Sequence, residues 1–160
     1  MKKTLFIVIV FLVVISSIGC SKKTINKTEE NWEESPTLVR EVVVTDDGQT
    51  EDSVFRIGDN GKLGIGQYGP FIAGESQKHM WHFWGEQEIL TQPFTVIGIN
   101  KETDEEITVF ENSASNSLAP NNGADHHIPS MMMLPNAGLW KLKVYFGEEL
   151  FGNVIVNVED

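Results

Sequence analysis

Residues 138–159 read GLWKLKVYFGEELFGNVIVNVE, and this stretch carries the clearest structural pattern of the chain. Apolar and polar side chains alternate on both sides of a short GEE connection, as in two strands that each bury one face. In the first strand one face carries Trp140, Leu142, Val144 and Phe146, and the other, polar face carries Lys141, Lys143 and Tyr145. The second strand places a valine at every other position from Val154. The stretch therefore predicts an antiparallel hairpin.

Shorter segments of the same kind precede this hairpin. Strand-length runs bounded by Gly, Pro, Asn or Asp occur at KHMWHFWG (78–85), FTVIGIN (94–100), EEITVFEN (105–112) and PSMMMLP (129–135). No segment shows a sustained period of 3.6 residues, so we expect almost no helix. About seven short strands at this spacing predict an all-β domain, an antiparallel sandwich of two sheets, over residues 51–160.

The N-terminus carries a targeting signal. Two lysines precede the apolar run LFIVIVFLVVI (5–15), which is shorter than the roughly 20 residues of a membrane-spanning helix. The run ends in SSIGC, with a glycine directly before Cys20. This ending resembles the lipobox of bacterial lipoproteins, which implies that residues 1–19 are a signal peptide and that Cys20 is lipidated. Two acyl chains, such as palmitate, would anchor the protein stably in the membrane.

Composition narrows the classes of partner. Cys20 is the only cysteine, so a lipid on it leaves no thiol for a disulfide or a metal. Residues 20–50 begin with a polar stretch and are predicted to be the lipidated cysteine and a flexible tether. Without Lys2 and Lys3 the chain has 10 basic and 23 acidic residues, a net charge of −13. We therefore expect no nucleic-acid partner, because phosphate binding requires a basic patch.

Three sequence features together resemble those of a known protein family. LPNAGLWKLKVYFGEELFGNVIVNVE (134–159) looks like the closing hairpin of bacterial immunoglobulin-like domains. With KHMWHFWG and the lipobox, the chain resembles a family of uncharacterised lipoproteins of Bacillus-type Gram-positive bacteria, over about residues 62–158. The resemblance implies an immunoglobulin-like β-sandwich that is anchored by lipid on the extracytoplasmic face of the cell membrane. It carries over no activity.

The stretch KHMWHFWGE (78–86) holds half of the tryptophans and half of the histidines. Side chains alternate on a strand, so His79 and His82 point to opposite faces and cannot chelate one ion. One face carries His79, Trp81 and Phe83, and the other carries Lys78, Met80, His82 and Trp84. We assign the first face to the core, because the lysine on the second resists burial. The second face is then a candidate binding surface, either exposed or covered by a loop.

The candidate cover is ENSASNSLAPNNGADHHIP (111–129), a long loop of the kind that is usually functional or disordered in compact domains. It ends with His126 and His127 and leads into three methionines, 131–133. Two hypotheses stay open: these side chains fill the core and hydrogen-bond the loop, or they bind a soft cation such as Cu(I). Because no ligand spacing supports a metal, we expect no metal or other cofactor.

Catalysis is not expected. Asp125 with His126 or His127 and a serine could be drawn as a catalytic triad, but the sequence contains no Gly-x-Ser-x-Gly nucleophile elbow to accompany them. The chain is predicted to be a membrane-anchored extracytoplasmic lipoprotein whose domain is a non-catalytic binding or interaction module of the cell envelope. Its partner would be an envelope protein or a glycan. The candidate ligand-binding residues are Met80, His82, Trp84, His126 and His127. The alternative is His/Met-based copper binding or handling.

Overall fold

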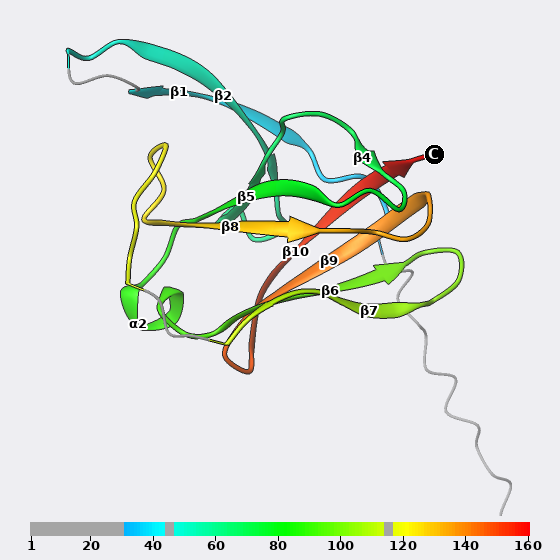
Figure 1. Cartoon of the computed structure of the whole chain (residues 1–160). Helices are drawn as coiled ribbons and strands as arrows, with labels where there is room; N and C mark the ends of the chain where they lie inside the picture. Colours follow the sequence, from blue (N-terminus) through cyan, green and yellow to red (C-terminus); the bar gives the residue numbers. More distant parts are fainter. Residues whose placement is uncertain (1–30, 44–46, 114–116) are drawn as a thin grey trace, which may run out of the picture. The chain divides into compact units, whose positions relative to one another are not determined.

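The structure is a computed structural model that describes residues 31–43, 47–113 and 117–160 (Figure 1). The expected signal peptide and Cys20 lie outside these residues. Trp32–Asp160 forms one compact unit. Its elements are β1 (Thr37–Val43), β2 (Thr50–Ile57), β3 (Leu63–Gly66), β4 (Phe71–Ile72), β5 (Gln77–Phe83), α2 (Gln87–Leu90), β6 (Phe94–Asn100), β7 (Glu106–Asn112), β8 (His126–Met132), β9 (Gly138–Phe146) and β10 (Glu149–Glu159). No helix in the described part of the chain is long and apolar enough to cross a membrane.

The strands form two five-stranded sheets. Sheet A has the order β1-β2-β3-β5-β8, and sheet B has the order β4-β10-β9-β6-β7. Neighbouring strands are antiparallel, apart from β4, which runs parallel to β10. The predicted all-β sandwich with almost no helix is confirmed. The described residues contain ten strands where about seven were expected, partly because the two-residue β4 is too short to produce an alternating pattern.

The core lies between the two sheets and follows the predicted alternation. Trp140, Leu142 and Val144 of β9 are fully buried, as are Val154 and Val156 of β10. Aromatic rings from both sheets pack edge to face or tilted, with centroids 4.9 to 5.8 Å apart, in a cluster of Phe83, Phe94, Phe146 and Phe151. Such contacts add to the stability that the buried area itself provides.

One residue of the closing hairpin is less exposed than its pattern indicates. Lys141 lies on the polar face of β9, yet it is only 6% exposed. Its Nζ lies 4.3 Å from the ring centroid of Trp32, which contacts it as a cation–π partner. Trp32 belongs to the stretch that composition assigns to the tether. The sequence therefore gave no reason to expect it on this face.

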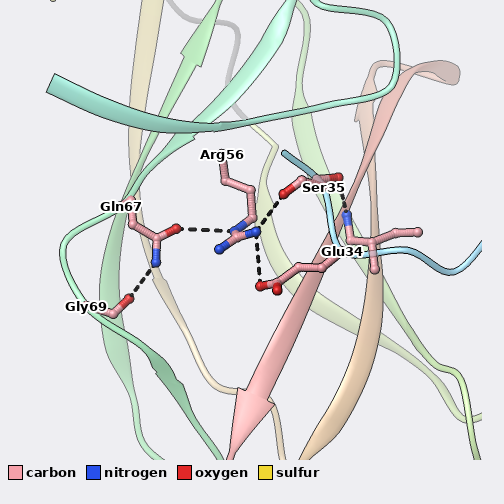
Figure 2. A network of polar contacts seen from close by, with 6 residues as sticks. Glu34, Ser35, Arg56, Gln67 and Gly69 are labelled. Carbon is pink, nitrogen blue, oxygen red and sulfur yellow. Dashed lines mark hydrogen bonds and ion pairs between the residues drawn. The ribbon is translucent and has the colours of Figure 1, made fainter. Parts of the chain in front are cut away.

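Residues 32–36, which we call the N-terminal strap, are bonded to both sheets before β1 begins (Figure 2). Ser35 N donates to Ile155 O, and Ile155 N donates to Ser35 Oγ, each at 2.9 Å. Pro36 O accepts from Ile57 N at 2.8 Å. The first pair satisfies backbone groups on the edge of β10 in sheet B, and the third bond joins the strap to β2 in sheet A.

Arg56 of β2 adds a charged contact to the strap (Figure 2). Its Nη1 donates to Ser35 O at 2.6 Å and lies 3.0 Å from Glu34 Oε1, while its Nε donates to Gln67 Oε1 at 3.2 Å. The Arg56 side chain is only 12% exposed, so this ion pair is shielded from water on one side. With these contacts the compact unit begins at Trp32, upstream of the domain boundary drawn from composition.

Candidate functional site

Strand β5 positions most of the residues that the sequence singles out, because it lies between β3 and β8 in sheet A. Trp81 and Phe83 are fully buried on the inner face, as predicted. Trp81 Nε1 donates to Ser130 Oγ at 2.9 Å, so its polar atom is satisfied. His79 shares this face and stacks on Phe71, with ring centroids 4.4 Å apart. Burial lowers the pKa of His79 from 6.5 to about 4, so this ring is neutral at pH 7.

The outer face of β5 is covered rather than open. His82 has no exposed surface, and Met80 and Trp84 are half-buried. Phe55 of β2 packs edge-on against this face, with its ring centroid 4.7 Å from that of His82 and 6.0 Å from that of Trp84. Gly64 of β3 leaves room for these rings, because a Cβ there would lie 3.3 Å from Trp84 Cζ3. Sequence reasoning missed Phe55 and Gly64, which lie on other strands.

The expected cover is present in residues 117–125, which we call the covering loop. A hydrogen bond of 3.2 Å joins His82 Nε2 to Asn121 Oδ1. Trp84 Nε1 donates to Gly123 O at 2.7 Å. These two bonds tie the side chains of the candidate surface to the loop, which therefore occupies the place where a ligand would reach them.

The guanidinium of Arg40, on β1, also covers Trp84. Its Cζ lies 4.4 Å from the centroid of the Trp84 ring. This cation–π contact brings the β1–β2 ribbon onto the same face as the covering loop. Trp84 thus has Arg40 over its ring and the loop at its indole nitrogen, an arrangement that no local sequence pattern indicates.

His126 and His127 are neighbours on β8 and diverge, as expected for an extended chain. His126 is 2% exposed on the inner face beside Phe83, and its Nδ1 accepts from Ala119 N at 2.9 Å. His127 lies opposite His82, with ring centroids 6.4 Å apart, and its Nδ1 lies 2.6 Å from Ala119 O. A carbonyl oxygen only accepts, so His127 is protonated on Nδ1. Because its Nδ1 accepts, neutral His126 is protonated on Nε2.

Burial disfavours the charged forms of His82 and His126. It is the largest cause that lowers the pKa of each ring, and the charge of His127 lowers both further. The hydrogen bond to Asn121 acts in the opposite direction for His82. Within the described residues, His82 Nδ1 and His126 Nε2 are buried without a hydrogen-bond partner. A charged His126 ring would therefore lack a partner at Nε2, whereas the hydrogen bonds of His82 to Asn121 and to the Met80 backbone offset only part of the cost of burying its charge.

The arrangement divides the predicted site residues between two faces. Met80, His82, Trp84 and His127 share the outer face, and His126 lies on the inner one. Asp125 Oδ2 accepts from Gly85 N at 2.9 Å, whereas the two histidines that follow it bind Ala119. In residues 31–43, 47–113 and 117–160, no three His, Cys, Asp or Glu side chains are grouped closely enough to hold a metal.

A second polar site, which no sequence pattern predicts, lies beside the strap. It is a cavity of about 500 Å³ lined by Glu34, Arg56, Gln67, Gly69, Pro70, Phe71, Asn157 and Glu159. The strap carboxylate of Glu34 faces the guanidinium of Arg56 there (Figure 2). A single arginine in a strand has no distinguishing sequence pattern, so only the fold reveals this cavity.

Comparison with known proteins identifies a solved structure with a similar fold and a family model that matches this chain. The solved structure described as "X-ray Crystal Structure of a Putative Lipoprotein from Bacillus anthracis" is similar to this chain, with a TM-score of 0.58 and 22% sequence identity. The similarity covers 82% of this chain and 88% of that chain. At this identity it shows a shared fold. No curated protein matches the chain.

The family model is the stronger comparison. It is described as "Domain of unknown function (DUF4871)" and matches residues 23–156. The match spans the N-terminal strap, both sheets and the covering loop. It agrees with the expected kinship to an uncharacterised family. This chain therefore belongs to the DUF4871 family.

Proposed function

We propose that this chain is a lipid-anchored lipoprotein on the extracytoplasmic face of the cell membrane, and that its β-sandwich is a non-catalytic module that binds another component of the cell envelope. The SSIGC ending at Cys20 supports the anchor. The description of the similar Bacillus anthracis structure contains the words "Putative Lipoprotein". The β9–β10 hairpin supports an immunoglobulin-like kinship of the sandwich.

The strap is the observation that carries this proposal. Only the 11 residues 21–31 separate Cys20 from Trp32, and 11 fully extended residues reach at most roughly 40 Å. Because the strap is bonded to both sheets, the domain meets its linker at one fixed point. A domain held close to the membrane at a fixed point offers the same surface to other membrane-associated molecules. That arrangement suits docking.

The proposed docking surface is the exposed part of the outer face of sheet A. Met131 and Met133 are 56% and 50% exposed, and Met80 is half-buried on the neighbouring strand. Methionine side chains are flexible and adapt to apolar partners. His82 and Trp84 are covered by the covering loop and by Phe55. The partner would therefore first contact the exposed methionines and not these two residues. We propose an envelope protein as the partner.

Site-specific photo-cross-linking in cells tests this surface. A photoreactive side chain at position 131 or 133 of the full-length protein should give a discrete adduct with an envelope protein. Position 157 is the matched control, because Asn157 is exposed on β10 in the other sheet. Adducts with glycan would identify the other partner class. Equal adducts from all three positions, or none from 131 and 133, would contradict the proposed surface.

Copper handling is a second candidate that one observation favours. His82 and His127 face each other across β5 and β8, and Met80 lies on the same face. Calorimetry with Cu(I) and Cu(II) separates this function from docking, with the His82→Ala/His127→Ala variant as the comparison. Stoichiometric binding that the variant loses would support copper handling. The same weak heats for both proteins would reject it.

A further inference from the structure

The cavity beside the strap is lined by a guanidinium with N–H donors that its surroundings do not use. Arg56 carries five such donors. It contacts Ser35 O and Glu34 Oε1 through Nη1, and Gln67 Oε1 through Nε (Figure 2). None of these three contacts uses Nη2. Since Arg56 lines the cavity, its Nη2 can donate to an acceptor that enters there.

The guanidinium is also held in place before any ligand binds. Gln67 Nε2 donates to Gly69 O at 3.3 Å, which orients Gln67 Oε1 toward Arg56. The Arg56 side chain is 12% exposed, and its contacts come from both the strap and the turn after β3. A donor that is fixed in advance loses little freedom on binding, and a hydrogen bond from a charged donor is strong. The cavity therefore provides a preformed site for a carboxylate.

Glu34 occupies only part of this site. Its Oε1 lies 3.0 Å from Arg56 Nη1, whereas an arginine and a carboxylate pair best through two parallel N–H···O bonds. The Glu34 side chain is 42% exposed, so water can solvate it when a second carboxylate displaces it. A ligand carboxylate can thus bind Nη2 beside Glu34 or take its place.

The charges around the cavity determine what else the ligand must carry. The charged lining residues are Arg56, Glu34 and Glu159, one positive and two negative, so their net charge is −1. A phosphate or a simple carboxylate meets more like charge than opposite charge there. A ligand that also has an ammonium group places a positive charge near the two glutamates. The amides of Gln67 and Asn157, also in the lining, suit a polar ligand.

We propose that this cavity binds a small zwitterion, an amino acid or a short peptide, whose carboxylate accepts from Arg56 Nη2 and whose ammonium group lies near Glu34 and Glu159. The cavity volume of about 500 Å³ lies within the roughly 300–1,000 Å³ of sites for small molecules. A site of this size does not take a folded protein. The proposal is therefore independent of the docking surface on sheet A, and position 157 remains a control for protein adducts.

Titrations of the full-length protein in detergent micelles, followed by ¹H–¹⁵N NMR at pH 7 and constant ionic strength, test the proposal. The probes are alanine and alanyl-alanine, which are zwitterions, acetate, which has only the carboxylate, and ethylammonium, which has only the ammonium group. A zwitterion should shift the amide of Gly69, in the cavity lining, and bind about tenfold or more tightly than either single-charge probe. The amide of Val144, in the core, should not shift.

The outcomes of these titrations are distinct. Saturable binding of a zwitterion supports the proposal, and the tighter of the two identifies the ligand as a free amino acid or a peptide. The absence of a saturable shift at Gly69 would overturn the proposal. Equal affinity for acetate or ethylammonium would overturn the zwitterion as the ligand class.

Two matched pairs of variants assign the contacts. Arg56→Lys keeps the charge but loses the fork of donors, so it should weaken binding of the tighter zwitterion about tenfold or more. Arg40→Lys is its control, because Arg40 contacts Trp84 and does not line the cavity. Glu159→Gln should weaken binding up to about fivefold, whereas Glu149→Gln, at the other end of β10, should not change it. Unchanged affinity in both Arg56→Lys and Glu159→Gln would refute these contacts. If Arg56→Lys does not fold, the exposed Glu159 and Glu149 pair decides the question.

Discussion

Gly98, in the middle of β6, allows a direct test of how closely the core is packed. It pairs with Ile107 on one side and Leu142 on the other. A Cβ at this position would lie 2.7 Å from Val109 Cγ2 and 3.1 Å from Trp140 Cε3. Neither neighbour moves easily: valine is stiff at χ1, and Trp140 is fully buried with its Nε1 bonded to Asn136 O at 2.8 Å.

The Gly98→Ala substitution should therefore destabilise the domain. Overpacking of this kind costs about 1–3 kcal/mol, and the reduced freedom of the unfolded chain returns about 0.4–1 kcal/mol. The net loss is about 1–2 kcal/mol. Gly85→Ala is the matched control, because a Cβ there meets its nearest atom, Phe151 Cε2, at 3.6 Å, an ordinary contact. This control should be neutral or slightly stabilising.

Urea unfolding of the soluble chain from residue 21 onward, followed by far-UV circular dichroism, measures the difference. With a slope of about 1–3 kcal/mol per molar urea, the midpoint of Gly98→Ala should lie roughly 1 M below that of Gly85→Ala. Equal midpoints would show that Val109 and Trp140 yield to a methyl group. The account of a closely packed sandwich between β6 and β9 would then fail.

Three further predictions address the anchor, the strand facing and the buried histidines. Cys20→Ser should leave the protein unprocessed or release it from membranes, and a mature-sized variant that stays in the membrane fraction would exclude lipid anchoring. Trp81→Ala should cost about 3–5 kcal/mol in urea titrations, whereas Trp84→Ala should leave the domain folded and cost less; equal losses would contradict the assignment of faces. The free energy of unfolding should fall as the pH drops from 6.5 toward 4, because folding lowers the pKa of His79. The His79→Leu variant should lack up to about 3 kcal/mol of that loss. If its stability falls with pH as steeply as that of the natural protein, His79 is not the cause.

Alternation along single strands was enough to predict the facing of the clearest segments. Leu142 and Trp81 are buried as the period-2 pattern requires, and the opposite orientation of His126 and His127 follows from the same rule. These predictions succeed because the geometry of a strand is local. They need no knowledge of which strands become neighbours.

Contacts between segments that are far apart in the sequence could not be predicted from the sequence. His82 and His127 are opposite each other only because β5 pairs with β8 in one register. Trp32 covers Lys141, although the two are more than a hundred residues apart. Nothing in the sequence around Phe55 predicted that its ring would pack against that of His82. Composition and alternation describe one segment at a time, so they could not predict any of these contacts.

The strap also determines how the domain would respond to mechanical load. A pull on the linker arrives at Trp32 and is transmitted through Ser35 to β10 and through Pro36 to β2. The force is thus divided between both sheets before it reaches β1, the outermost strand of sheet A. Survival under force is governed by the rate of unfolding. If the proposed lipid anchor and the proposed partner pull on the domain from opposite sides, β1 stays in place until the hydrogen bonds of the strap break.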